Sequence, residues 1–228
     1  MKMLREERAK LAQMDFTEKR QYIWEYYKLH IFAFLIVSFM TFSLINTLIF
    51  NPPRQEYLYF VWVGPPVTSF VLDDFAEELN EIVENPGRYV VRATNYSQAG
   101  LDPQMAMGLQ ARFVAQLQQR SLDLFMLTKD ELYSYSSNGL VLPIMIFMDV
   151  LEELNPAVHG IMKGRLVEIS YYAVEYGVVK TDYMAASMHG IPFFEKFDIH
   201  TDDLYLAVVI NSERFDRVVR ALEVIFDV

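Results

Sequence analysis

Cysteine is absent from this 228-residue sequence, and the motifs of several common enzyme classes are absent with it. Without cysteine the chain has no disulfide, no thiolate nucleophile and no cysteine-based metal site. The patterns G-x-S-x-G, G-x-x-x-x-G-K-[ST] and G-x-G-x-x-G, which mark a hydrolase nucleophile and two phosphate-binding loops, do not occur either. We therefore expect no cofactor and a function other than catalysis.

Charge, glycine and proline are all missing from residues 31–50, IFAFLIVSFMTFSLINTLIF. A helix of about 20 residues is about 30 Å long, which matches the hydrocarbon core of a bilayer. The run is longer than the apolar part of a usual signal peptide, and no A-x-A-like cleavage site follows it. We predict an uncleaved signal anchor that contacts the lipid bilayer through residues 29–50, with a cleaved signal peptide as the alternative.

The basic residues near this segment are distributed unequally. Residues 1–30 contain seven Lys or Arg, whereas Arg54 is the only basic residue between the apolar run and Arg88. An excess of basic residues marks the cytoplasmic side of a membrane helix. We therefore predict a single-pass protein of the cell membrane, with its N-terminus in the cytoplasm and its C-terminal domain extracellular.

The expected domains follow from this layout. They are a cytoplasmic amphipathic segment (1–28), a transmembrane helix (29–50), a short linker (51–56) and an extracytoplasmic domain (57–228). Asp15 and Glu18 have the spacing of a helix-capping box in the first segment. Residues 54–228 hold 13 basic and 25 acidic residues, a net charge of −12. Such a strongly acidic domain argues against nucleic acid as a partner and against docking on anionic lipid.

Beyond the linker, the apolar pattern alternates between strand and helix. Three strand–helix units in succession favour parallel strands with helices on both faces of the sheet. We therefore predict an α/β fold, layered α/β/α, with a mostly parallel sheet. The expected strands are 57–63, 88–96, 122–127 and 204–210, the expected helices are 67–84, 103–120, 129–137, 147–154 and one from about 212, and the weaker extended segments are 165–172 and 178–181.

In sheets of this kind, ligands bind beyond the carboxyl ends of the parallel strands. Those ends are expected at 64–68, 95–98 and 128–130. The candidate ligand-binding residues are therefore Gly64, Thr68, Asn95, Tyr96, Ser97, Thr128 and Lys129.

Two other groups of residues are candidate sites. His189 and His200 lie close in sequence to Asp198, Asp202 and Asp203, but without the spacing of a known metal motif, so we expect a polar loop and no metal. The segment 133–137, YSYSS, could form the rim of a sugar site or could simply pack and solvate a short helix.

Four short segments carry a resemblance to a known family. They are Leu122-Asp123-Leu124, Asn138-Gly139-Leu140-Val141-Leu142-Pro143, His189-Gly190-Ile191-Pro192 and Asn211-Ser212-Glu213-Arg214. Their order and spacing over most of 57–228 resemble the N-terminal type of lobe in bacterial extracellular solute-binding proteins. In that family two lobes close on a solute; this sequence ends where a second lobe would continue, so tight capture of a small solute is not expected. The order of elements, a YIWEYYK motif followed by a single membrane span and a lobe-like domain, also resembles that of uncharacterised single-pass membrane proteins of Gram-positive bacteria.

These observations favour a non-enzymatic, membrane-anchored extracytoplasmic binding module. The expected partner is a protein of the membrane or envelope, for example a transporter complex, and the identity of any small-molecule ligand is left open. Two alternatives remain: a hydrolase or transferase acting at the membrane surface, and a structural subunit of a larger membrane assembly.

Overall fold

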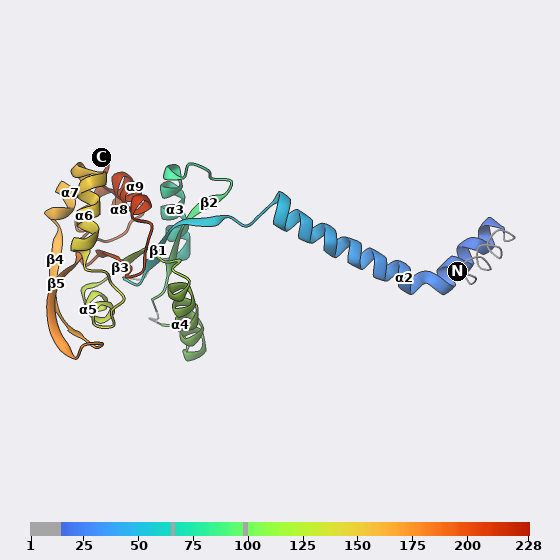
Figure 1. Ribbon diagram of the computed structural model, residues 1–228, viewed down its shortest axis with the longest axis horizontal. Coiled ribbons are helices and arrows are strands. Elements are labelled where there is room, and N and C mark those ends of the chain that lie inside the picture. The colour runs from blue at the N-terminus through green and yellow to red at the C-terminus, as the bar shows by residue number, and fades with distance from the viewer. Residues whose placement is uncertain (1–14, 65–66, 98–99) are drawn as a thin grey trace. The chain divides into compact units, whose positions relative to one another are not determined.

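A computed structural model describes residues 15–64, 67–97 and 100–228 of the chain (Figure 1). The chain divides into two compact units, Met1–Pro53 and Arg54–Val228. Four of the seven basic residues that predict the orientation lie in 1–14, outside the described residues, as do Pro65, Pro66 and Gln98 of the expected strand-end loops.

The first unit contains one long helix. Helix α2 (Phe16–Ile45) continues into a short π-helix, η1 (Asn46–Phe50), without a break between the expected cytoplasmic segment and the expected span. At its start the Asp15 backbone N–H donates to the Glu18 carboxylate at 3.2 Å, which confirms the predicted capping interaction. The stretch Trp24–Phe50 is long and apolar enough to cross a membrane, and none of its most apolar part is buried in protein.

Two polar side chains of the apolar segment, Thr41 and Asn46, have hydrogen-bond partners close by in the chain. The Thr41 hydroxyl donates to the Val37 carbonyl oxygen at 2.8 Å. The Asn51 backbone N–H donates to the Asn46 carbonyl oxygen at 2.7 Å, and their side-chain amides meet at 3.1 Å. Because these groups need no water or partner, the helix suits an apolar environment.

The second unit is built on one six-stranded sheet of order β2-β1-β3-β6-β5-β4. Strand β1 pairs in parallel with both β2 and β3, as predicted. The strands are β1 (Gln55–Trp62), β2 (Tyr89–Asn95), β3 (Leu124–Leu127), β4 (Leu166–Ala173), β5 (Val178–Ser187) and β6 (Tyr205–Val208). The start of β1 at Gln55 takes in the last two residues of the expected linker.

The prediction of a mostly parallel sheet is wrong, because the sheet is mixed. Strand β6 runs antiparallel to β3, and β5 and β4 continue the antiparallel half. The physical reason lies in the connections. Only four residues join β4 to β5, and Gly177 adopts a positive φ of 66° there. A link this short can form a hairpin, whereas parallel strands need a crossover of a dozen or more residues.

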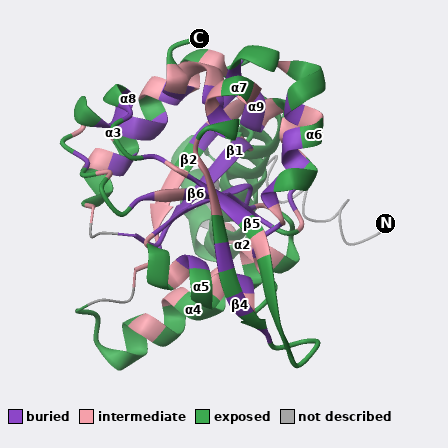
Figure 2. Ribbon diagram, turned by 90° about the vertical axis from the view of Figure 1, so that its left-hand side faces the viewer, coloured by how far each residue is buried: buried purple, intermediate pink, exposed green. Residues whose placement is uncertain are grey.

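Helices cover the two faces of the sheet unequally (Figure 2). Side chains of β1 alternate between the faces: Leu58, Phe60 and Trp62 point into one core, and Tyr59 and Val61 into the other. The first core is covered by α3 (Ser69–Leu79), α6 (Ile144–Leu154), α7 (Pro156–Lys163), α8 (Pro192–Glu195) and α9 (Phe215–Phe226). The second is covered by α4 (Pro103–Gln118) and α5 (Lys129–Ser137). We name these the covered face and the open face.

A buried ion pair ties three elements together at the amino end of β3. Asp123 is fully buried, and its carboxylate accepts hydrogen bonds from Tyr59 N at 2.8 Å, Ser212 Oγ at 2.9 Å and Arg214 Nε at 2.8 Å. Arg214 also donates to the carbonyl oxygens of Glu56 and Ser121. Every polar atom of the Asp123 carboxylate therefore has a partner, which a buried charge requires.

Candidate binding groove

In the first predicted loop, after β1, the two candidate binding residues make contacts that stabilise the fold. Gly64 is buried, its N–H donates to the Met126 carbonyl oxygen at 3.1 Å, and a side chain there would meet Leu204 and the β3 backbone. Thr68 caps α3, since its hydroxyl accepts from Val71 N at 3.5 Å. Both residues shape the loop; whether they also bind a ligand stays a prediction.

The second loop, after β2, joins the first. The Asn95 side-chain amide donates to the Val67 carbonyl oxygen at 3.0 Å and accepts from Ser97 N at 2.7 Å. The Tyr96 N–H donates to the Trp62 carbonyl oxygen, and the Tyr96 ring contacts Phe113 of the helix that follows the loop, α4. The structure thus brings the first two predicted loops together, as the parallel pairing of β1 and β2 requires.

The third loop, after β3, starts a helix. Thr128 and Glu131 form the predicted capping box of α5, with the Glu131 carboxylate accepting from Thr128 N at 3.0 Å. The Lys129 N–H donates to the Asp203 carboxylate at 3.3 Å. Among the seven predicted binding residues, Tyr96 is the one that lines a described cavity.

That cavity is a groove of about 400 Å³ on the open face, between α4 and α5. We name it the α4–α5 groove. Its lining is mostly aromatic and aliphatic, with three polar side chains at the sides. The lining residues are Tyr96, Leu109, Gln110, Phe113, Val114, Leu117, Ser134, Tyr135, Asn138 and Leu140.

The sequence places α4 so that the groove remains open. Asp102 caps the helix by accepting from Gln104 N and Met105 N, and Pro103 occupies the first turn, as predicted. Leu109, Phe113 and Leu117 recur every four residues and turn toward the sheet, yet none of the 16 residues of α4, all of them described, is fully buried. The helix therefore covers the sheet without closing its own apolar side.

Three aromatic rings form the floor. Phe113 lies 5.4 Å from Tyr96 and 5.9 Å from Tyr135, centroid to centroid, in edge-to-face contacts. Tyr135 in turn contacts Phe125 of β3 at 5.1 Å. Edge-to-face pairs of this kind fix ring orientation and stabilise the floor beyond the burial of its area.

A chain of hydrogen bonds holds the floor to the sheet. Tyr96 donates its hydroxyl hydrogen to Gln116 Oε1, and Gln116 Nε2 donates to the Tyr59 hydroxyl at 3.2 Å. Tyr59 donates to Thr94 Oγ1 at 3.0 Å. Burial raises the pKa of Tyr96 above its ordinary value and that of Tyr135 to about 12. Burial thus favours the neutral form of both hydroxyls, which can donate hydrogen bonds.

The rim of the groove is apolar and accessible. Val114 is 44% exposed and Met107, seven residues earlier on the same side of α4, is 71% exposed. A buried floor with an exposed apolar rim is the geometry of a recess that takes an apolar group.

The histidine–aspartate segment does not assemble a metal site. His189 Nδ1 lies 3.3 Å from Asp202 Oδ1, and both side chains are largely exposed. Within 15–64, 67–97 and 100–228 no three His, Asp or Glu side chains gather as a possible ligand set. Asp203 instead accepts from the backbone of Lys129.

A second cavity, of about 420 Å³, lies between α7, α8 and α9 on the covered face. Its two cations already have partners. Arg165 donates to the carbonyl oxygens of Ser187 and His189, and Lys196 pairs with Glu78 at 2.6 Å. We therefore take the α4–α5 groove as the better candidate site.

No protein-family model matches this chain, and no curated protein matches it. Among solved structures, a match is the crystal structure of a TRAP periplasmic solute-binding protein from Ochrobactrum anthropi, whose C-terminus is bound in its ligand-binding pocket. Identity is 18%, the TM-score is 0.21, and the match covers 50% of this chain and 36% of that one. This is a distant structural resemblance, and the chain spans just over a third of that protein's length.

Ser134 and Tyr135 of the groove belong to the segment 133–137, for which the sequence offers the rim of a sugar site as one interpretation, whereas the α4 residues of the groove are not among the predicted binding residues. The sequence did place Ala106, Leu109, Phe113 and Leu117 on one face of a helix, and that face is half-buried. The signal in the sequence is an apolar stripe that alternates with four glutamines, because Arg112 is the one charged residue of α4 whereas α3 and α6 each carry several acidic residues.

Proposed function

We propose that this chain is a non-enzymatic, membrane-anchored binding module, whose second unit presents the α4–α5 groove to a protein partner outside the cytoplasm. The observation that carries the proposal is the groove itself. It combines a fixed aromatic floor, an exposed apolar rim and hydrogen-bonding groups from Gln110, Ser134 and Asn138. The distant resemblance to a solute-binding protein gives no support for a particular ligand.

A polypeptide suits the groove better than a small solute does. The apolar surface extends beyond the cavity along α4 through Met107 and Val114, so an occupant would bury more area than the cavity alone provides. Methionine at such a rim adapts to different side chains. An apolar helix or loop that inserts one or two side chains between α4 and α5 fits this shape.

The anchor is supported by the length and apolar character of Trp24–Phe50. A signal peptide passes the same test, so the distinction needs an experiment. Since the chain has no native cysteine, single cysteines can be introduced and labelled cleanly. In intact cells, a membrane-impermeant maleimide should label Asp202→Cys and should label Thr17→Cys only after permeabilisation. Labelling of Thr17→Cys in intact cells, or release of the chain from washed membranes, would contradict the anchor.

The groove can be tested by site-specific photo-cross-linking in membranes. A benzophenone amino acid at Val114 should give a discrete cross-linked product, and the same amino acid at Met145, an exposed residue of α6 on the covered face, should not. Phe113→Ala in the Val114 background should remove the product. Equal cross-linking at both positions would sink the proposal, whereas a solute-induced rise in unfolding temperature without cross-links would favour a small ligand.

A further inference from the structure

Basic residues gather at one end of the second unit although the unit as a whole is acidic. Seven of the 13 basic residues of 54–228 surround the start of β1, where the chain enters from the first unit. We name this cluster the arginine edge. It consists of Arg54, Arg88, Arg92, Arg120, Arg214, Arg217 and Arg220.

Side chains of three of these arginines, Arg92, Arg214 and Arg217, contact residues at the beginning of β1. The Arg88 carbonyl oxygen accepts from Gln55 N at 2.7 Å, which sets β2 beside the first residue of the strand. Arg217 donates to the Tyr57 carbonyl oxygen at 3.0 Å. Arg92 lies 3.6 Å from the Glu56 carboxylate, with half of its own side chain still exposed. Part of the edge is therefore held in place against the start of β1.

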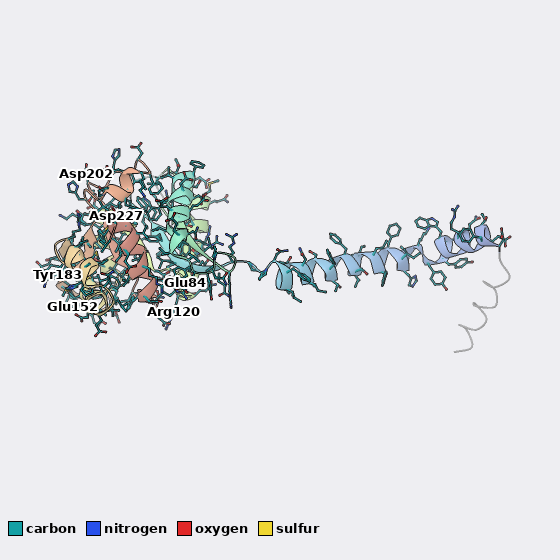
Figure 3. The ribbon with its side chains drawn as sticks, turned by 90° about the horizontal axis from the view of Figure 1, so that it is seen from above. Glu84, Arg120, Glu152, Tyr183, Asp202 and Asp227 are labelled. Atoms are coloured by element: carbon teal, nitrogen blue, oxygen red, sulfur yellow. The ribbon has the colours of Figure 1, made fainter. Side chains whose placement is uncertain are left out.

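Two tyrosines order the centre of the edge. The Arg217 guanidinium lies 4.7 Å from the Tyr57 ring and 5.8 Å from the Tyr89 ring, and Arg88 lies 5.5 Å from Tyr89. A cavity of about 230 Å³ opens beside them, with Arg220 and Glu84 at its side. Figure 3 labels Glu84, which lies at the end of the unit where β1 begins. Stacked guanidinium groups retain in-plane donors that can receive phosphate oxygens.

The charge balance differs sharply between this edge and the remainder of the unit. Five carboxylates accompany the seven arginines, so the edge carries +2. The other six basic and 20 acidic residues of 54–228 give −14. The five carboxylates are those of Glu56, Glu84, Asp123, Glu213 and Asp216. The net charge of −12 is therefore distributed unevenly over the unit, with the positive charge at the arginine edge.

Chain length keeps this edge close to the membrane if the first unit spans it. From Phe50 to Gln55 the chain advances five residues, which reach at most about 18 Å when fully extended. The linker thus confines the start of β1 to the headgroup region and the first layers of water. Cationic groups held there are attracted by anionic headgroups at about 1 kcal/mol each.

We propose that the arginine edge docks on the anionic phosphate headgroups of the bilayer that holds the tether. This inference depends on the proposed membrane anchoring. Docking at this edge would restrict the orientation of the unit on the membrane and direct its acidic remainder away from the lipid.

The test uses the full chain reconstituted in vesicles. A fluorophore is attached to Asn85→Cys at the edge or, as a control, to Asp202→Cys beyond the carboxyl ends of the parallel strands. Quenching by a headgroup-attached quencher is compared in phosphatidylcholine and in phosphatidylcholine with phosphatidylglycerol. We expect phosphatidylglycerol to increase quenching at position 85 and not at 202. At about 1 M NaCl, where the Debye length is about 3 Å, the increase should vanish.

Charge variants sharpen the test. The triple variant Arg88→Gln, Arg92→Gln and Arg220→Gln should lower the ratio of docked to undocked molecules about fivefold for each arginine removed. The matched variant Lys129→Gln, Lys163→Gln and Lys180→Gln removes the same charge elsewhere and should keep the phosphatidylglycerol effect. If quenching at position 85 does not depend on lipid charge, or if both variants lose the phosphatidylglycerol effect equally, the docking proposal is overturned. Flotation with the vesicles separates the two claims: a chain that floats but does not dock retains its anchor, and one that does not float loses both.

Discussion

On the covered face of the sheet, five helices bury a continuous core, whereas on the open face two helices leave an aromatic groove between them. The same strands supply both faces, since β1 sends alternate side chains to each. The difference therefore comes from the helices. α3, α6 and α9 each bury several apolar residues, while α4 buries none completely.

This contrast separates two uses of apolar surface. On the covered face, Phe75 contacts Phe60, Phe193, Phe194 and Phe197 and stabilises the fold. On the open face, Phe113 contacts Tyr96, Phe125 and Tyr135 but remains partly accessible. We expect substitutions on the first face to change stability most and those on the second to change binding most.

The largest effect on stability is expected from Phe75→Ala. Phe75 is fully buried among four aromatic rings, so its removal should lower the free energy of unfolding by about 3–5 kcal/mol. Denaturant unfolding of the full chain in mild detergent, followed by the fluorescence of buried Trp62, measures the change. Phe75→Leu is the matched control and should cost distinctly less. A loss near zero for Phe75→Ala would show that the covered face is not a packed core.

A smaller loss is expected from Phe113→Ala on the open face. The side chain is partly rather than fully buried, so the loss should be smaller, about 2 kcal/mol, measured in the same way. The same variant should abolish cross-linking at the groove. If it destabilises the chain as much as Phe75→Ala does, the groove is part of the core and the contrast between the faces fails.

Much of this fold could be predicted because local signals agree with it. The pattern of YLYFVWV, the caps at Asp102 and Thr128 and the apolar stripe of α9 all depend on neighbouring residues. The direction of the last three strands depends instead on which segments pair in the sheet. Helix α7 is not among the predicted elements; it begins directly after α6, and Asn155 lies at the end of one helix and caps the next.

Contacts between distant segments explain why the sites were harder to predict. Glu213 with Arg217, and Asp216 with Arg220, have helical spacing, yet Arg217 donates to Tyr57, Arg220 pairs with Glu84, and Glu213 pairs with Arg120. Likewise, the predicted binding residues lie beyond the ends of β1, β2 and β3. There Thr68 and Thr128 cap helices, and Asn95 joins two loops. The α4–α5 groove depends on how far α4 stands from α5, which no local pattern encodes.

Alkaline pH should loosen the open face through Tyr135. Burial raises the pKa of Tyr135 from 10.0 to about 12, so between these values the unfolded chain releases a proton that the folded chain keeps. The contribution to stability is complete below pH 10 and is lost as pH rises toward 12, with a slope of at most about 1.4 kcal/mol per pH unit. Tyr135→Phe should flatten the slope. An unchanged slope in Tyr135→Phe would contradict the buried placement of this hydroxyl.

The smallest change in stability is expected from Val114→Asp at the exposed rim of the groove. Because the side chain already faces water, the free energy of unfolding should change by no more than about 0.5 kcal/mol. Binding should nevertheless be lost, since a partner's apolar side chain would have to desolvate the new carboxylate. Photo-cross-linking from Gln110, on the same wall of the groove, measures this, with Met145→Asp on α6 as the matched control. A variant that unfolds normally and still cross-links would show that the partner does not enter between α4 and α5, and the open face would then need another explanation for its exposed apolar rim.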